Sequence, residues 1–161
     1  MKIAIVTDST CYLPQAEIDK HHITVVPIPV ILDGAVYDEG KDITTEEFYA
    51  KLKTAKTFPS TTQPPLGEML KLYENLANEG YDTIISIHLA STISGFVNTL
   101  KGAVDEVQGA KVYVYDSQIT VILMGWLVLA AAQMAEAGDD PEAILARLDN
   151  LRTTMGEYFI V

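Results

Sequence analysis

Short apolar runs alternate with helix-like segments along most of the chain. Residues 3–6, 83–88 and 111–115 are apolar runs of strand length rich in β-branched side chains. Continuous runs of this kind are typical of strands buried on both faces of a parallel sheet. Helices are expected between and after them, at residues 14–21, 44–53, 66–79, 95–107, 118–137 and 141–152. The alternation predicts an α/β fold, a mainly parallel sheet with helices on both faces.

Residues 23–37 carry a different signal, because prolines interrupt their apolar run. Pro27 and Pro29 lack the backbone N–H that a central strand needs, so at least part of residues 23–32 is expected to be an edge strand. Asp33-Gly34 then separates two apolar triplets. Both residues tolerate a positive φ, which predicts a tight β-hairpin.

Turn and capping residues set the remaining boundaries. Thr44 and Glu47 form a capping box that predicts a helix start. The proline-rich residues 58–65 are expected to be loop, and Gly80 is expected to end the third helix. The apolar residues 158–161 resemble the start of one more strand, which suggests that the chain continues in a longer protein.

Charge and composition exclude several classes of function. The 161 residues carry a net charge of -11, which argues against nucleic acid and against anionic membrane surfaces. The single cysteine, Cys11, cannot form an internal disulfide and fits a cytoplasmic protein. The longest apolar stretch, residues 119–132, is shorter than the roughly 20 residues of a membrane span, so it is interpreted as a buried helix.

Polar residues follow the predicted strands, and two hydroxyl-rich loops stand out. Ligands of open parallel sheets bind beyond the carboxyl ends of the strands. The first loop is Ser60-Thr61-Thr62-Gln63, and the second is Ser91-Thr92-Ile93-Ser94-Gly95, placed where a helix is expected to begin. Hydroxyls and free helix N–H groups can bind an anionic head group. The alternative is that these residues serve only as caps and turns.

Taken in order, these motifs resemble the DegV family. Thr7-Asp8-Ser9-Thr10 with Leu13-Pro14 is similar to the opening motif of that family, and Thr61-Thr62-Gln63-Pro64 is similar to its Thr-Ser-Gln-Pro loop. Ser91-Thr92-Ile93-Ser94-Gly95 is similar to its Ser-x-Leu-Ser-Gly loop, and Asp116-Ser117 follows the next strand as in the family. The resemblance covers essentially the whole chain, and the ordered set is more specific than any single motif.

The resemblance implies a bacterial fatty-acid-binding protein without catalytic residues, metal or cofactor. It implies that Thr61 and Ser94 hold the carboxylate of a long-chain fatty acid, with Thr62, Gly95 and Ser91 beside them. It also implies a partner, an ATP-binding fatty acid kinase subunit that phosphorylates the bound acid. Residues 1–161 would form the N-terminal domain, and a second domain that closes the family's hydrophobic tunnel is absent from this chain.

The chain departs from the family pattern at a few positions. Tyr12 stands where an aspartate is usual, and Val121 and Leu123 replace a serine and a glycine. Leu123, Trp126 and Leu127 of the apolar helix are candidates for the tunnel wall, although plain core packing is the simpler interpretation. The departures put ligand length and affinity in question more than the family.

Two other classes of function stay open. One is a regulatory or interaction domain that carries no ligand. The other is a serine hydrolase built on Ser94 and His88, although no Gly-x-Ser-x-Gly motif and no Asp–His pair is evident in the spacing. Adjacent His21 and His22 are expected at a solvated surface rather than at a metal, and Cys11 is expected to be buried rather than nucleophilic.

Overall fold

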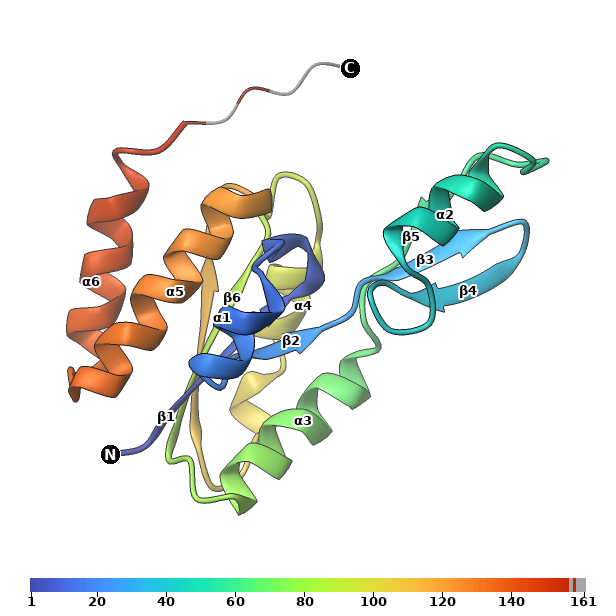
Figure 1. Cartoon of the computed structure of the whole chain (residues 1–161). Coiled ribbons are helices and arrows are strands. Elements are labelled where there is room, and N and C mark those ends of the chain that lie inside the picture. The colour runs from blue at the N-terminus through green and yellow to red at the C-terminus, as the bar shows by residue number, and fades with distance from the viewer. Residues whose placement is uncertain (157, 159–161) are drawn as a thin grey trace.

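The computed structural model describes residues 1–156 and 158 as a parallel α/β body and a smaller projecting lobe (Figure 1). The body holds a four-stranded sheet in the order β2-β1-β6-β7, with every neighbouring pair parallel. Its strands are β1 (Ile3–Asp8), β2 (Thr24–Val26), β6 (Thr83–His88) and β7 (Lys111–Asp116). The predicted α/β class and mainly parallel sheet are therefore confirmed.

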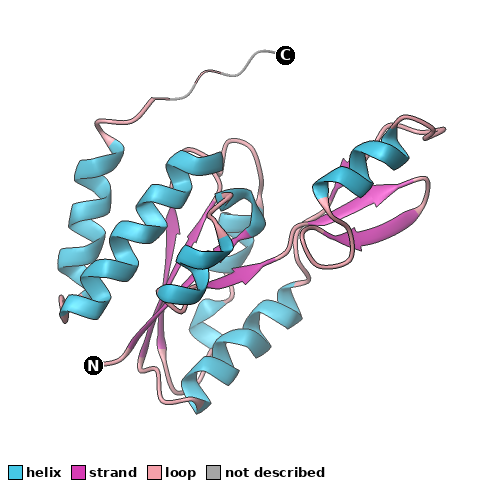
Figure 2. Cartoon of the chain, viewed as in Figure 1, coloured by secondary structure: helices cyan, strands magenta, loops and turns pink. Residues whose placement is uncertain are grey.

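Helices cover both faces of this sheet, as expected (Figure 2). On one face lie α1 (Gln15–Lys20), α5 (Val121–Ala137) and α6 (Pro141–Arg152), and on the other lie α3 (Leu66–Asn78) and α4 (Phe96–Lys101). Short 3-10 turns occupy η1 (Ser9–Cys11) and η2 (Val104–Glu106). The chain leaves β1 toward β2 and leaves β6 toward β7, which are opposite edges of the sheet, and the general right-handedness of such crossovers places the connecting helices on opposite faces.

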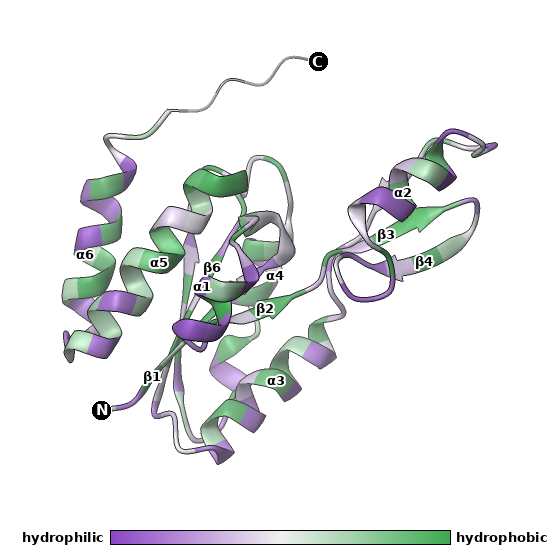
Figure 3. Ribbon diagram, in the orientation of Figure 1, coloured by the Kyte–Doolittle hydropathy of each residue, from purple (hydrophilic) through white to green (hydrophobic). Residues whose placement is uncertain are grey.

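The core forms on both faces of the two central strands, under α5 on one face and under α3 and α4 on the other. Ile84, Ile85 and Ile87 of β6 are fully buried, as expected for a strand covered on both faces. Helix α5 is apolar over most of its surface (Figure 3), and its Leu127 and Val128 are fully buried. The simpler interpretation of Leu127 as a core residue is therefore correct, whereas Trp126 on the same helix is half exposed.

The lobe is residues 29–61, inserted between strand β2 and helix α3. It contains β3 (Pro29–Leu32), β4 (Ala35–Asp38), α2 (Thr45–Leu52) and β5 (Ser60–Thr61). Its strands form a separate antiparallel sheet in the order β4-β3-β5. Pro29 is tolerated in β3 because it is the first residue of that strand.

Two local predictions within the lobe are confirmed and one is wrong. Asp33 and Gly34 adopt φ of 48° and 82°, the left-handed conformation that the predicted hairpin requires. Thr44 and Glu47 form the predicted capping box. Residues 58–65 are not entirely loop, because Ser60 and Thr61 pair with Ile31 and Val30. A two-residue strand of polar side chains carries no alternation from which it could be predicted.

Some predicted boundaries in the body also need correction. The helix expected over 95–107 ends at Lys101, and a separate 3-10 turn follows at Val104–Glu106. Helix α5 begins at Val121 rather than near residue 118. The strand expected at 158–161 lies outside the described residues apart from Tyr158. Among the described helices, none combines the length and apolarity needed to cross a membrane.

The expectation for His21 is wrong as well. His21 is 9% exposed, and its Nδ1 lies 2.9 Å from Glu136 Oε1 of α5, so this ring packs α1 against α5. Only His22 is exposed as expected. The pairing with Glu136 lies 115 residues away in sequence, so local pattern could not predict it.

Candidate functional site

Both hydroxyl loops face one cavity at the junction between the body and the lobe. This cavity has a volume of about 670 Å³, and we call it the clamp cavity. Its wall includes Thr61 and Thr62 from the lobe side and Ser94 and Gly95 from the body side. The remaining lining residues are Thr10, Tyr12, Ile28, Val30, Glu39, Gln63, Leu89 and Ile93. The structure thus brings together four of the five residues singled out in the sequence.

Ser91 is the fifth residue, and it does not line the clamp cavity. Its backbone N–H donates to Asp116 Oδ1 at 3.1 Å, and the N–H of Gln118 donates to the same oxygen at 3.0 Å. Burial would raise the pKa of Asp116, but the hydrogen bonds from Ser91 and Gln118 hold it below its ordinary value. Ser91 therefore attaches the second hydroxyl loop to the end of β7.

The second hydroxyl loop is held by its own backbone as well. Ser94 N–H donates to Ala90 O at 3.1 Å, and Ser94 Oγ accepts from Phe96 N–H at 3.3 Å. Because α4 has only six residues, its dipole adds little, and the hydroxyl is the main donor that this loop offers to a ligand. The sequence predicted that free N–H groups at the helix start would bind a ligand together with the hydroxyl, so the role of the helix itself is smaller than predicted.

Gln63 connects the two hydroxyl loops, a role that the sequence did not predict. Its Oε1 accepts from Thr99 Oγ1 of α4 at 3.1 Å. A Cβ placed on Gly95 would lie 3.0 Å from Gln63 Nε2, so glycine lets the Gln63 side chain lie close to the loop. The two loops are therefore in direct contact on this side of the clamp cavity.

A buried polar network lies beneath the second loop. His88 Nδ1 lies 2.9 Å from Asp8 Oδ2, and His88 Nε2 lies 2.7 Å from Ser86 Oγ. Ser86 Oγ is in turn 2.8 Å from the hydroxyl of Tyr73. All four side chains are fully buried. Alternating positions on β6 place Ser86 and His88 on one face, but the partners Asp8 and Tyr73 come from distant segments.

Asp8 is the charged end of this network and the link to the cavity wall. Burial would raise its pKa, but the bonds and charge of His88, with Thr10 and the Leu89 N–H, lower it below the ordinary value. Asp8 is therefore an acceptor, and His88 Nδ1 donates to it. Burial also raises the pKa of Tyr73 to about 12, so its phenol keeps its proton. The network thus has a charged acceptor at one end and a protonated phenol at the other.

The same network bears on the hydrolase hypothesis. The Asp–His pair that the spacing did not reveal does exist, between Asp8 and His88. However, Asp8 and Ser86 occupy both ring nitrogens of His88, so neither is free to activate Ser94. Cys11 is buried as expected, and burial raises the pKa of its thiol, which makes the nucleophilic thiolate scarcer.

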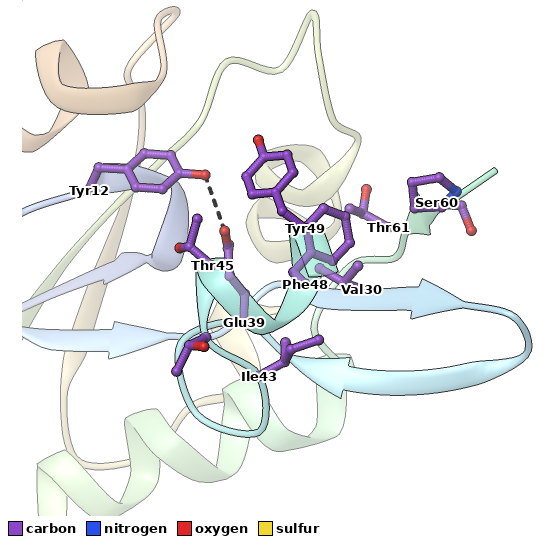
Figure 4. A pocket seen from close by; sticks show the side chains of 11 residues that line it. Tyr12, Val30, Glu39, Ile43, Thr45, Phe48, Tyr49, Ser60 and Thr61 are labelled. Carbon is purple, nitrogen blue, oxygen red and sulfur yellow. Dashed lines mark hydrogen bonds between the residues drawn. The ribbon is translucent and has the colours of Figure 1, made fainter. Parts of the chain in front are cut away.

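A second, more apolar cavity of about 360 Å³ adjoins the clamp cavity under helix α2 (Figure 4). Val30, Ile43 and Phe48 contribute its apolar surface. Tyr12 and Glu39 stand between the two cavities, because both residues line both of them. Among the described residues that line the clamp cavity there is no lysine, arginine or histidine, and Glu39 contributes a carboxylate, so only hydroxyl and N–H groups could donate to an anion there.

Comparisons with known proteins agree on one family. The family model described as uncharacterised proteins of the DegV family matches residues 2–161. A DegV domain-containing protein of Listeria innocua is 42% identical over 160 residues, which are 99% of this chain and 56% of the relative. The chain therefore spans about half the length of this relative.

Solved structures show the same relation. The crystal structure of DegV, a fatty acid binding protein from Bacillus subtilis, superposes with a TM-score of 0.90 at 36% identity, over 95% of this chain and 54% of that one. A structure that describes fatty acid binding by a DegV family protein from Thermus thermophilus gives a TM-score of 0.86 at 37% identity, with the same coverage.

Proposed function

Because the chain belongs to the DegV family, we propose that it contributes the carboxylate-binding half of a fatty-acid-binding protein. The observation that carries the proposal is the clamp cavity, in which Thr61 of lobe strand β5 and Ser94 of the loop after body strand β6 line one space. Two similar solved structures are described as fatty acid binding. The protein binds its ligand without transforming it.

The composition of the clamp cavity suits an amphiphile with a small polar head. Thr61, Thr62 and Ser94 offer hydroxyl donors, whereas Ile28, Val30 and Leu89 offer apolar wall on the same cavity. Burying one methylene contributes about 0.8 kcal/mol, so a long acyl chain supplies most of the binding energy. The hydroxyls then fix the position of the head group.

Single substitutions can test whether the hydroxyls of Thr61 and Ser94 bind the carboxylate. We expect Thr61→Ala and Ser94→Ala each to weaken palmitate binding by about 1 kcal/mol or more, the effect of losing a hydrogen bond to a charged group. Titration calorimetry on the complete protein measures the change. Matched controls are Ser60→Ala, next to Thr61 on the same strand, and Thr92→Ala, on the same loop as Ser94; neither residue lines the clamp cavity. Unchanged affinity in both clamp variants contradicts the assignment.

A second experiment separates lipid binding from the ligand-free interaction domain. Mass spectrometry of solvent extracts from freshly purified complete protein should detect a long-chain fatty acid in stoichiometric amount. An extract without any acyl chain favours the ligand-free alternative.

The proposal extends to a separate partner. A carboxylate held by hydroxyls at the edge of the sheet can be presented to an ATP-dependent fatty acid kinase that phosphorylates it. We expect acyl phosphate, trapped with hydroxylamine, only when protein, fatty acid, kinase and ATP are all present. Equal product without the binding protein contradicts this step.

A further inference from the structure

The two halves of the clamp cavity belong to parts of the molecule that share no sheet. Thr61 lies on β5, which pairs with β3 of the lobe, whereas Ser94 follows β6 of the body. Figure 1 shows the lobe projecting from the body beyond β2. The separation of the two hydroxyls therefore depends on the contacts that hold the lobe in place.

A cluster of three side chains spans this junction. Glu39 follows β4 in the lobe region, and its Oε1 accepts from the hydroxyl of Tyr12 at 3.1 Å (Figure 4). Its Oε2 accepts from Ser9 Oγ at 2.5 Å. Ser9 Oγ in turn accepts from the N–H of Ile28 at 3.0 Å. Ser9 and Tyr12 belong to the η1 region after β1, so the cluster joins the body directly to the lobe.

The backbone on each side of the cluster is fixed. Tyr12 has a φ of 47°, and its N–H donates to Ser9 O, so the turn directs the phenol outward from η1. The N–H of Glu39 donates to Ile28 O at 3.3 Å. Burial, followed by the charge of Glu39, raises the pKa of Tyr12 to about 12, so the phenol keeps the proton that it donates. A contact between two fixed elements can transmit a change in position.

We propose that Tyr12 and Glu39 are positioning residues, a latch that holds the lobe against the body and so sets the spacing between Thr61 and Ser94. The latch slows the departure of a bound fatty acid, because the clamp opens only when the lobe moves. The part of the proposal that concerns ligand release rests on the proposed function. The part that concerns lobe position does not.

The latch is tested with small substitutions. Tyr12→Phe removes only the phenol oxygen, and Glu39→Gln removes the charge. Tyr49→Phe is the matched control. Tyr49 lines the apolar cavity under α2 together with Tyr12 and Glu39, and removing its hydroxyl leaves both hydrogen bonds to Glu39 in place.

Lobe position is measured by pulsed electron paramagnetic resonance between nitroxides at Phe58→Cys in the lobe and Gln133→Cys on α5. Both residues are exposed, and the native Cys11 is replaced by alanine. We expect one narrow distance in the otherwise unchanged chain and in Tyr49→Phe, and a broader or longer distribution in Tyr12→Phe and Glu39→Gln. Unchanged distributions in both latch variants overturn the proposal.

Ligand release is measured as transfer of radiolabelled palmitate from the protein to albumin. We expect each latch variant to release palmitate roughly 5-fold faster, the factor that the loss of one typical net hydrogen bond gives. The melting temperature should fall by no more than about 2–4 °C, the shift that the loss of one net hydrogen bond gives in a chain of this size. A broadened distance with no palmitate binding in any variant overturns the proposed function and leaves the lobe latch standing. A broadened distance with an unchanged release rate overturns control of release.

Discussion

Asp8 holds the two sides of the body that meet at the clamp cavity. It accepts from Thr10 in the η1 turn, from the N–H of Leu89 in the second loop, and from His88. We expect Asp8→Asn to lower the free energy of unfolding by about 2 kcal/mol at pH 7, because a buried charged acceptor is lost. Denaturant titration measures the change, and the exposed Asp105→Asn should change it by less than about 0.5 kcal/mol. Equal effects of the two substitutions contradict this role.

The carboxylate of Asp8 should also make the stability of the protein depend on pH. The pKa of Asp8 in the folded protein lies below its ordinary value of 3.8, so the folded state binds this proton less readily than the unfolded state. Its stabilising contribution is present above pH 3.8 and is lost as the pH falls through the folded value. The difference between the unaltered protein and Asp8→Asn should therefore narrow below about pH 4. A constant difference from pH 7 down to pH 2.5 contradicts the linkage.

Val121 carries backbone strain at the start of α5. Its φ is 54°, in the left-handed region that costs an ordinary L-residue about 1–2 kcal/mol. We expect Val121→Gly to raise the free energy of unfolding by about 1 kcal/mol. Ile122→Gly is the control, because its exposure is similar (38% against 40%) but its backbone is not strained, so it should lower stability by about 1 kcal/mol. Urea titration measures the free energy of unfolding of both variants. If both variants are less stable than the unaltered protein, Val121 does not carry the proposed backbone strain.

At the scale of elements, the approach of α5 to the η1 turn depends on one glycine. A Cβ on Gly125 would lie 2.5 Å from Cys11 O and 3.0 Å from Leu13 Cδ2. Because the first contact is with backbone, we expect Gly125→Ala to lower the free energy of unfolding by about 2 kcal/mol. Gly67→Ala is the matched control in helix α3, where a Cβ meets nothing within 4 Å, and it should raise stability by about 0.5–1 kcal/mol. Thermal unfolding measures the stability of both variants. An increase in stability for Gly125→Ala would contradict the close approach of α5 to the η1 turn.

Elements were predictable where their signals are local. The capping box at Thr44, the turn at Asp33-Gly34 and the buried strand at Thr83–His88 follow from adjacent residues. Strand β5 did not, because it depends on a tertiary contact, whereas the early end of α4 at Lys101 was missed although Gly102 directly after it is a local stop signal. The separate lobe sheet was missed because its pairing of Val30 with Thr61 spans strand β4, helix α2 and the segments that connect them.

At the scale of the whole molecule, the sequence motifs predicted which loops meet, but not the side-chain contacts that hold them together. The hydroxyl-rich motifs predicted that Thr61, Thr62, Ser94 and Gly95 share one site, and the structure places these four residues around one cavity; that they bind a ligand stays a prediction. The roles of Glu39, Gln63 and the Asp8–His88 pair were not predictable, because each depends on a contact between segments far apart in the chain.

The insertion of the lobe between β2 and α3 also determines the order in which the molecule can fold. Strand β1 pairs with β6, and Ile3 can meet Thr83 only after the 79 residues between them have been synthesised. The β3–β4 hairpin pairs neighbours in sequence and closes a very short loop. We therefore expect the lobe hairpin to form early during synthesis, and the central sheet to form late, as the slow step of folding.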